Sequence, residues 1–534
     1  MMKTTPLMHT VTKSLLSRIL SLHYLAFLTL LFYSVVSSAQ PGKQLPRSTP
    51  EAEGVSSEAI LRFVEAAEKS ETEFHSMMLL RNGKVIAEGW WAPYRADLKH
   101  TMYSVTKSWT STAVGFAVAE GHVSVEDKVI KFFPDELPDT VSDYLKQLSV
   151  RNLLTMTVGH DPDPTFNIVS GSENWVRDFL ARPIDDKPGS KFLYNTTATY
   201  MLSAIIQKVT GQKVIDYLKP RLFDPLGITD VDSEVDPKGI NTGGWGMRVR
   251  TEDMAKLGQL YLQKGMWNGK QILPASWIKD ATSRQILQAP DAAQNVRDSS
   301  DWLQGYGYQF WRTRHNAFRA DGAFGQFIVA LPEKDMVIVF TGETPDMQRQ
   351  INLAWEHILP GVKEQPLPRS TTAQKELAKK LKGLALPVPD KGIKSVRETT
   401  VQNKPIVLEA NEFGIEQIVI RSKGSLYTID IKTKSDEFPI RFGSGRWVFG
   451  ETKKHGPYLL SGAKAKFEGL PPFKVAGAYS WKDNNILELT LRYIESPHTE
   501  KITLTFDEHN ATLVIANSFA PESPVTILGK YSRN

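Results

Sequence analysis

Cysteine is absent from all 534 positions of the sequence, which excludes disulfide bonds, thiolate nucleophiles and cysteine-ligated metals. Two catalytic signatures are missing as well: there is no G-x-S-x-G nucleophile elbow and no H-E-x-x-H pair of metal-binding histidines. A strong charge of one sign is also lacking, because 64 basic residues nearly balance 59 acidic ones. The apolar content of 41% is typical of a folded globular protein, and the length predicts more than one domain.

The N-terminus carries the pattern of an export signal. Three basic residues come first: Lys3, Lys13 and Arg18. An apolar run then covers residues 24–36, shorter than the roughly 20 residues that span a bilayer, and small side chains up to Ala39 form a cleavage site. We expect residues 1–39 to be removed as a signal peptide, leaving a periplasmic or secreted protein without a membrane span. The removed segment has no acidic residue, so the formal charge falls from +5 to +2 and indicates no nucleic-acid partner.

Apolar patterning predicts one sheet whose strands come from both ends of a long domain, residues 40–362. Two apolar runs flank Asn82-Gly83, which favours a tight hairpin. Residues 125–275 are mostly helix and loop, and after Trp302 two more apolar runs are joined by a turn at residues 332–335. Strands on either side of a helical middle predict an α/β (α+β) fold with a helical insertion.

The composition changes after this domain. Residues 363–390 have prolines at both ends and a lysine-rich helical pattern between them, so we expect a linker containing a helix, with residues 379–382 on its solvated face. Beyond it, apolar residues alternate with polar ones in two segments, 487–493 and 502–506. Such alternation, separated by Gly and Asn turns, predicts a small antiparallel β domain over residues 391–534.

A serine three residues before a lysine occurs at three places: Ser104/Lys107, Ser276/Lys279 and Ser461/Lys464. The spacing puts both side chains on one helical face, and only the first pair opens a strongly apolar segment, predicted as a helix over residues 104–120. Burial there would lower the pKa of Lys107 and let it take the proton of the Ser104 hydroxyl. From spacing alone, a surface lysine beside a serine that starts a helix is equally well supported. We expect the other two pairs to be surface features.

Four segments in a fixed order strengthen the first pair. They are HTMYSVTKSWTSTAVGFAVAEG (100–121), PGSKFLYNTTATYMLS (188–203), INTGGWGMRVRTEDMAKLGQLYLQKG (240–265) and FRADGAFGQFIVALPEKDMVIVF (318–340). Together they resemble the serine β-lactamase and penicillin-binding-protein family, in the branch that holds class C enzymes, DD-peptidases, esterases and 6-aminohexanoate-dimer hydrolases. The resemblance covers about residues 50–360. It implies a β-lactamase-like fold, with an antiparallel sheet flanked by helices and a helical insertion domain.

The resemblance also implies roles for particular residues. Ser104 would be the nucleophile, Lys107 the base, and Tyr194 of the second motif the group that hands the proton to the leaving group. The backbone N–H groups of Ser104 and Ala323 would form the oxyanion hole. A position after Pro188-Gly189 and before a helix favours this role for Tyr194 over simple packing.

Two positions depart from the family pattern. Thr196 stands where the second motif has asparagine, and Ala320 stands where the third motif has lysine or histidine. By resemblance the missing groups contact a substrate amide and a β-lactam carboxylate, so their loss argues against a dedicated β-lactamase or D-Ala-D-Ala peptidase. The residues expected to line the substrate site are Thr196, Trp245, Asp321 and Gly322. For Trp245, filling a gap in the core is an equal alternative.

Two other clusters have simpler explanations. Residues 243–246 (GGWG) lack the lysine and the preceding strand of a phosphate-binding loop, which favours a flexible loop lining the site. His160, Asp161 and Asp163 lack a second histidine at helical spacing, which favours a polar loop over a metal site. The sequence therefore indicates no metal and no organic cofactor.

These patterns predict an exported serine hydrolase that cleaves an ester or amide bond of a small or short peptide-like substrate through an acyl-enzyme. Two alternatives remain open. One is a family member that binds peptide or cell-wall fragments without turnover, which the changes at Thr196 and Ala320 favour; the other is a true β-lactamase. The retained Ser104, Lys107 and Tyr194 oppose the first alternative.

Overall fold

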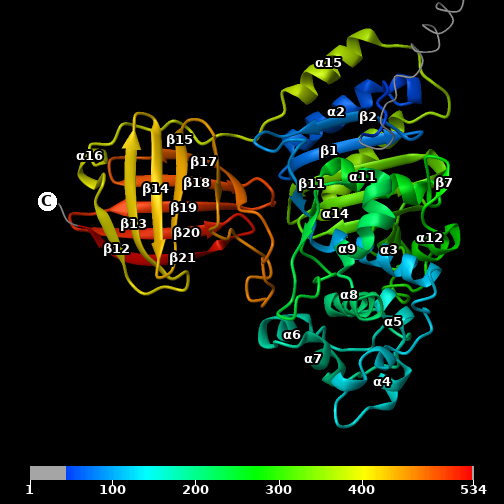
Figure 1. Cartoon of the computed structure of the whole chain (residues 1–534). Helices are drawn as coiled ribbons and strands as arrows, with labels where there is room; N and C mark the ends of the chain where they lie inside the picture. Colours follow the sequence, from blue (N-terminus) through cyan, green and yellow to red (C-terminus); the bar gives the residue numbers. More distant parts are fainter. Residues whose placement is uncertain (1–43, 532–534) are drawn as a thin grey trace, which may run out of the picture. The chain divides into compact units, whose positions relative to one another are not determined.

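The computed structural model describes residues 44–531, so the expected signal peptide lies outside the described residues. The first domain is built on a six-stranded antiparallel sheet in the order β2-β1-β11-β10-β9-β8 (Figure 1). Its strands are β1 Glu73–Arg81, β2 Lys84–Trp90, β8 Trp311–Thr313, β9 Ala317–Gly322, β10 Gln326–Leu331 and β11 Met336–Glu343. Because β1 pairs with β11, the sheet is made from both ends of the domain, as the sequence predicts.

Helices cover both faces of this sheet, which explains why β1 is apolar at consecutive positions. Met77 and Leu79 face one core, which contains α2 and α14, whereas Met78 and Leu80 face the other, which contains α3 and α11. The covering helices are α2 Ser57–Lys69, α3 Thr106–Ala119, α11 Thr251–Leu262 and α14 Met347–Leu353. Side chains of a strand alternate between the two faces of a sheet, so a strand covered on both faces has no polar side to show to solvent.

The two predicted turns of the sheet are present. Asn82 and Gly83, between β1 and β2, have positive φ angles of 52° and 74°. These angles match the right-handed twist of the strands they join. Between β10 and β11 the chain makes a short 3-10 helix, Pro332–Lys334, and then Asp335 adopts a φ of 43°.

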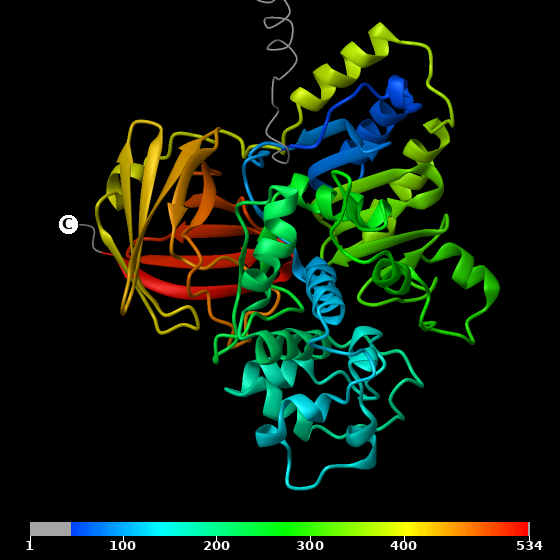
Figure 2. The same cartoon turned by 45° about the vertical axis from the view of Figure 1, so that its right-hand side comes forward.

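A helical segment is inserted between the two halves of the sheet. Its helices are α4 Asp143–Gln147, α5 Val150–Leu154, α6 Thr165–Gly171, α7 Trp175–Ala181, α8 Thr196–Thr210 and α9 Val214–Leu218. Figure 2 shows α3, in light blue, running between this segment and the sheet, and α3 packs directly on α8. No helix within residues 44–531 is both long and apolar enough to cross a membrane.

The C-terminal β domain is a sheet that closes on itself. Nine strands run in the order β15-β14-β13-β12-β21-β20-β19-β18-β17, and pairing of β15 with β17 closes the ring, while β16 pairs with β17 outside it. Their bounds are β12 Pro405–Leu408, β13 Ile415–Lys423, β14 Leu426–Thr433, β15 Glu437–Ser444, β16 Val448–Thr452, β17 Phe473–Trp481, β18 Ile486–Tyr493, β19 Thr499–Phe506, β20 Asn510–Asn517 and β21 Ala520–Tyr531. The two predicted alternations are β18 and β19, whose apolar residues Leu489 and Leu504 lie in the interior.

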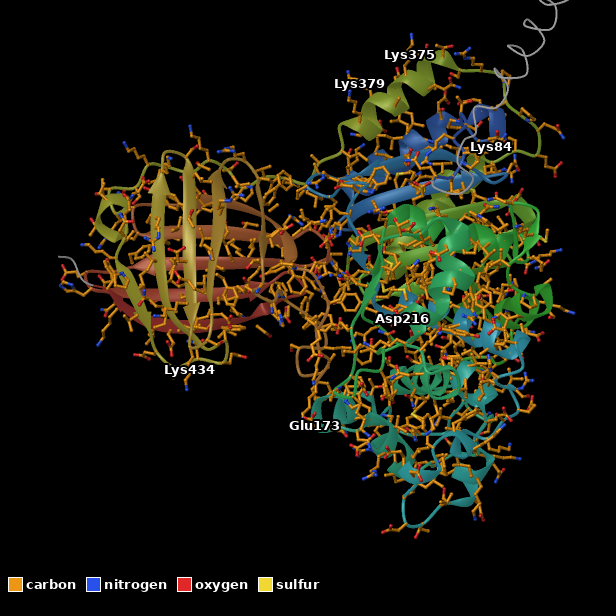
Figure 3. The ribbon with its side chains drawn as sticks, in the orientation of Figure 1. Lys84, Glu173, Asp216, Lys375, Lys379 and Lys434 are labelled. Carbon is orange, nitrogen blue, oxygen red and sulfur yellow. The ribbon has the colours of Figure 1, made fainter. Side chains whose placement is uncertain are left out.

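A helix, α15 (Thr371–Lys382), lies between the two domains in sequence. It packs against α2, and Leu377 is buried in the core on that face of the sheet. Lys380 forms an ion pair with Glu68 of α2. Lys375 and Lys379 are exposed and point away from the ribbon (Figure 3). Of the run 379–382 expected on the solvated face, Lys379 and Lys382 are exposed, whereas Leu381 packs against the core.

Candidate active site

The helix that contains Lys107 begins two residues later than the sequence predicts. The expected helix over residues 104–120 begins only at Thr106, and Ser104 sits in a 3-10 turn, Tyr103–Val105, that leads into α3. Tyr103 has a φ of 46°, a left-handed conformation that costs a non-glycine residue about 1–2 kcal/mol. Ser104 is partly exposed and lies just before the start of the apolar helix α3.

Lys107 occupies the first turn of α3 and is only 1% exposed. Its Nζ donates hydrogen bonds to Gly244 O at 2.8 Å, to Ser104 Oγ at 3.0 Å and to Thr196 Oγ1 at 3.2 Å. Burial lowers the pKa of Lys107 to about 7, although nearby carboxylates act in the opposite direction. A large fraction of this amine is therefore unprotonated near neutral pH.

The three partners of Lys107 differ in what they can do when the amine loses its proton. The Gly244 carbonyl can only accept a hydrogen bond, so it orients one N–H of the neutral amine. A hydroxyl can also donate, so Ser104 can turn its proton toward the free lone pair of the amine. This arrangement lets the lysine act as a general base toward the serine.

Tyr194 completes the group. It precedes α8, whose N-cap Asn195 accepts a hydrogen bond from Ala198 N at 3.0 Å and so holds the start of the helix. The Lys107 amine lies 4.9 Å from the centre of the Tyr194 ring. Burial raises the pKa of Tyr194, while a hydrogen bond with the Ser104 side chain acts in the opposite direction. The phenol is therefore protonated at neutral pH and can donate a proton. The structure brings all three predicted side chains together; their catalytic roles stay predictions.

The third motif runs directly beside Ser104. Gly322 ends β9, and a Cβ built on it would lie 2.2 Å from Met102 O and 3.1 Å from Ser104 N. Only glycine allows the strand to approach the Ser104 turn this closely. Ala323 is the first residue after β9. The proposed oxyanion hole of these two N–H groups stays a prediction.

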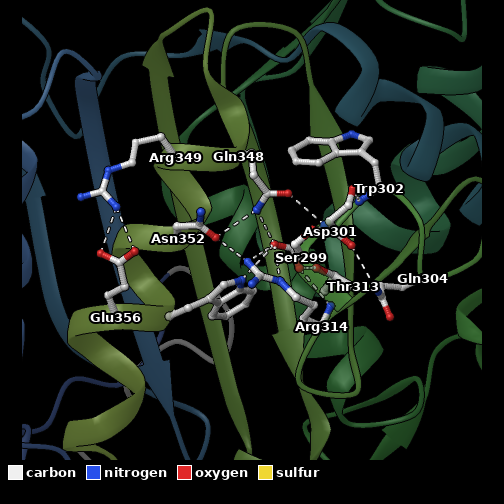
Figure 4. Close-up of polar contacts among 12 residues, drawn as sticks. Ser299, Asp301, Trp302, Gln304, Thr313, Arg314, Gln348, Arg349, Asn352 and Glu356 are labelled. Atoms are coloured by element: carbon white, nitrogen blue, oxygen red, sulfur yellow. Dashed lines mark hydrogen bonds and ion pairs between the residues drawn. The ribbon is translucent and has the colours of Figure 1, made fainter. Parts of the chain in front are cut away.

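Asp321 of the same motif is held by a buried polar network. Arg319 donates to the Asp321 carboxylate at 3.0 Å and to Asp301 O at 2.6 Å, and its guanidinium lies 4.3 Å from the Trp302 ring. The Asp301 carboxylate in turn accepts hydrogen bonds from Arg314 (Figure 4). Burial raises the pKa of Asp321, and the ion pair with Arg319 opposes this rise. The network holds β9 in place beside Ser104.

Two other residues expected to line the substrate site have clear structural contacts. Trp245 is 2% exposed and stacks on Trp175 with ring centres 5.7 Å apart, so it fills the core. Thr196 is half-buried and contacts Lys107. The substrate contacts of both residues stay predictions. The loop at 243–246 does line the site, because Gly244 supplies a carbonyl to the lysine.

The other two serine–lysine pairs lie at the surface, as the sequence predicts. Ser276 and Lys279 are exposed on α12 (Ala275–Thr282). Ser461 and Lys464 are exposed in a loop, where Lys464 pairs with Glu173 at 2.8 Å; Figure 3 marks Glu173 at the edge of the helical segment. The surface alternative is therefore correct for these two pairs and wrong for the first pair, whose Lys107 is buried.

The polar loop around His160 is also explained by local contacts. His160 Nδ1 lies 3.0 Å from Asn195 Nδ2, and Asp163 accepts a hydrogen bond from Thr165 Oγ1 at 2.7 Å at the start of α6. Within residues 44–531 no group of three or more His, Asp or Glu side chains could hold a metal ion. The contacts that sequence reasoning missed are the Gly244 carbonyl and the Arg319 ion pair. The glycines at 243–246 were a signal for the first, and no sequence pattern pointed to the second.

The chain is similar to known proteins over the first domain. A family model described as Beta-lactamase matches residues 67–358, more than half of the chain. A 6-aminohexanoate-dimer hydrolase of Paenarthrobacter ureafaciens is 25% identical over 296 residues, which cover 52% of this chain and 74% of that protein.

Two solved structures were also compared. A penicillin-binding protein homologue from Caulobacter crescentus is 16% identical, with a TM-score of 0.46, and covers 57% of this chain and 97% of its own. A penicillin-binding protein homologue from Pyrococcus abyssi is 15% identical, with a TM-score of 0.44, and covers 89% of this chain and 99% of its own. The match of the family model identifies the chain as a member of the Beta-lactamase family of serine hydrolases.

Proposed function

We propose that this protein is an exported serine hydrolase that cleaves an ester or amide bond through an acyl-enzyme intermediate. The observation that carries the proposal is the 3.0 Å contact between the Lys107 amine and the Ser104 hydroxyl. The amine has a pKa of about 7, so it can accept the hydroxyl proton at neutral pH. No metal or organic cofactor takes part in the proposed chemistry.

In the first half-reaction, Ser104 Oγ attacks the substrate carbonyl carbon while its proton moves to Lys107 Nζ. The carbonyl π pair moves to oxygen, and the N–H groups of Ser104 and Ala323 bind the resulting oxyanion. When the tetrahedral intermediate collapses, the bond to the leaving group breaks. Tyr194 gives its proton to the leaving group and takes one from the Lys107 ammonium, so the amine is neutral again.

In the second half-reaction, water attacks the acyl-enzyme. A neutral Lys107 next to Ser104 Oγ can assist removal of the water proton, and the same N–H groups bind the second oxyanion. Collapse breaks the bond between the acyl carbon and Ser104 Oγ and releases the carboxylic acid. The serine oxygen recovers a proton, which restores the starting state.

The substrate we propose is a small, linear or short peptide-like ester or amide. Ala320 is buried in β9 and offers no positive charge where a β-lactam carboxylate would be bound. The Thr196 hydroxyl oxygen accepts a hydrogen bond from Lys107, and threonine has no side-chain amide to pair with a substrate amide. The similarity to a 6-aminohexanoate-dimer hydrolase, whose name specifies a linear amide substrate, supports this choice.

Hydrolysis of p-nitrophenyl butyrate tests the proposal. We expect turnover by the wild-type protein and its loss in Ser104→Ala, while the matched variant Ser276→Ala, on a surface serine–lysine pair, keeps wild-type activity. Nitrocefin hydrolysis faster than ester cleavage would instead identify a true β-lactamase. No turnover of a panel of esters, linear amides and D-amino peptides would favour a member that binds without catalysis.

Export is part of the proposal and has its own test. We expect the protein recovered from the periplasm or the medium to begin at Gln40, after the Ala39 cleavage site. N-terminal sequencing of this protein, compared with the cytoplasmic fraction, measures the cleavage position. An uncleaved N-terminus in the recovered protein would contradict the signal peptide.

A further inference from the structure

The turn between β18 and β19 of the C-terminal β domain docks against the segment that precedes the nucleophile. Thr101 N donates to Glu495 O at 2.9 Å, and the Tyr94 hydroxyl donates to Ser496 O at 3.1 Å. Thr101 belongs to β3 (His100–Thr101), three residues before Ser104. The C-terminal domain is therefore bonded to the backbone that leads into the active site.

One side chain of this turn, that of His498, contacts the residue directly before Ser104. His498 has no exposed surface, and its Nε2 lies 2.5 Å from the Tyr103 hydroxyl. Its Nδ1 lies 2.6 Å from the Glu343 carboxylate at the end of β11. A carboxylate can only accept, so the imidazole proton is on Nδ1 and Nε2 accepts from the Tyr103 hydroxyl. This makes a buried chain of hydrogen bonds from Glu343 through His498 to Tyr103.

Tyr103 is the residue before Ser104 and has a left-handed backbone conformation with a φ of 46°. A tyrosine does not adopt this conformation without support, so its surroundings must hold it. Phe324 packs on the Tyr103 ring with centres 5.6 Å apart, and the hydrogen bond that the Tyr103 hydroxyl donates to His498 fixes the far end of the ring. A fixed Tyr103 ring also restricts the backbone dihedral angles of Tyr103. These angles set the directions of the Ser104 N–H and Cβ, because Ser104 is the next residue.

We propose that His498 of the C-terminal β domain is a positioning residue for the active site, acting through the Tyr103 hydroxyl to orient Ser104. Glu343 fixes the tautomer of His498 that this role requires. The inference rests on the proposed function of Ser104 as nucleophile. It gives the C-terminal domain a part in catalysis, since the nucleophile turn is held from both domains.

A residue that serves as a matched control lies next to this chain of hydrogen bonds. Tyr458, also from the C-terminal domain, stacks on Tyr103 with ring centres 6.0 Å apart, and its hydroxyl donates to Glu234 at 2.6 Å. Removing that hydroxyl takes away a buried hydrogen bond between the same two domains without touching His498. Tyr458→Phe therefore reproduces the structural cost of Tyr103→Phe but leaves the positioning contact in place.

The test measures how fast a fluorophosphonate labels Ser104. In this reaction a bond forms between Ser104 Oγ and phosphorus, fluoride leaves, and the serine proton passes to Lys107. The full-length protein is compared with Tyr103→Phe, His498→Ala, the double variant and Tyr458→Phe, and circular dichroism confirms that each is folded. The second readout is kcat and KM for p-nitrophenyl butyrate, each determined separately for every variant.

We expect Tyr103→Phe and His498→Ala each to slow labelling about 10-fold or more and to lower kcat with KM unchanged. The double variant should be no slower than either single variant, because the two residues act as one unit. Tyr458→Phe should label within about 2-fold of wild type. Because Tyr103→Phe keeps the ring, it carries the test even if His498→Ala does not fold.

Wild-type labelling rates in Tyr103→Phe overturn the positioning role while leaving the proposed function intact. Equal slowing in Tyr458→Phe also overturns it, because the effect would then come from loosening the domain contact in general. Absence of labelling in the wild-type protein is a different result: it contradicts Ser104 as nucleophile, and the inference about His498 falls with it.

Discussion

Gly322 and Ser104 lie so close that a single methyl group on the glycine would be 3.1 Å from the serine backbone nitrogen. The same methyl group would be 2.2 Å from Met102 O, a separation that no real structure tolerates. One side of the Ser104 turn is thus packed against the end of β9. The glycine of the third motif has a steric role here that is independent of any substrate.

Gly322→Ala should therefore displace the Ser104 turn. A shift of about 1 Å in a nucleophile can cost about 100-fold in rate, so we expect at least that loss in kcat for p-nitrophenyl butyrate. Stability should fall by about 1–3 kcal/mol because the new methyl group overpacks the site. Gly171→Ala is the control: no atom lies within 4 Å of its Cβ position, and activity should be unchanged. Wild-type kcat in Gly322→Ala would contradict the close packing.

The rate of acylation should depend on pH through Lys107. Its pKa of about 7 means that the amine is charged and inactive as a base below this pH and neutral above it. We expect kcat/KM to rise about 10-fold per pH unit up to pH 7 and to level off above it. Measurement from pH 5 to 9 with p-nitrophenyl butyrate gives the apparent pKa. A profile that is flat between pH 5 and 8 would exclude an unprotonated lysine as the base.

The lowered pKa of Lys107 also predicts how stability varies with pH. In the unfolded chain a lysine titrates near its ordinary pKa of about 10.4, so between pH 7 and that value the unfolded state holds one more proton. The contribution of Lys107 to the free energy of unfolding therefore rises by about 1.4 kcal/mol per pH unit in this range. Below pH 7 the folded state bears the full cost of burying a charged amine.

Lys107→Met lacks this titration. Between pH 7.5 and 9, the free energy of unfolding of the wild type should rise by about 1.4 kcal/mol per pH unit relative to that of Lys107→Met. Urea unfolding at several pH values measures it. The same pH dependence in both proteins would show that Lys107 stays charged in the folded state. This test is independent of catalytic activity.

Two tyrosines near the site should respond to loss of the hydroxyl in opposite ways. Tyr194→Phe removes the proposed proton carrier, so we expect kcat to fall about 100-fold with little change in stability. Tyr200 is buried in α8 and donates to Asp236 at 2.7 Å. Tyr200→Phe leaves that buried carboxylate short of a donor, so stability should fall by about 1–3 kcal/mol while kcat stays at the wild-type value.

Kinetics with p-nitrophenyl butyrate and thermal unfolding of both variants provide the comparison. A normal kcat in Tyr194→Phe would assign proton transfer to Lys107 alone. If kcat of Tyr200→Phe falls by a larger factor than the fraction of folded protein does, α8 positions the site through Tyr200.

Local chemistry made several features predictable from the sequence alone. Asn82-Gly83 favours positive φ angles, so the β1–β2 hairpin followed from two residues. The alternation at 487–493 places every second residue on one face, and β18 buries that face. The apolar run after Ser104 indicated that Lys107 would be buried. The start of α3 was placed too early, because the 3-10 turn at Ser104 depends on a left-handed Tyr103 that no local preference favours.

By itself the sequence determined the hairpin at Asn82-Gly83 and the alternating strands β18 and β19, since these depend on neighbouring residues, and through its resemblance to a family it predicted Ser104, Lys107 and Tyr194 as the site. Tertiary structure alone decided what holds that chemistry in place. Gly244 reaches Lys107 from 137 residues away, and His498 reaches Tyr103 from 395 residues away. The first contact lies within one domain and the second joins two domains, and both depend on how distant segments pack, about which spacing along a chain carries no information.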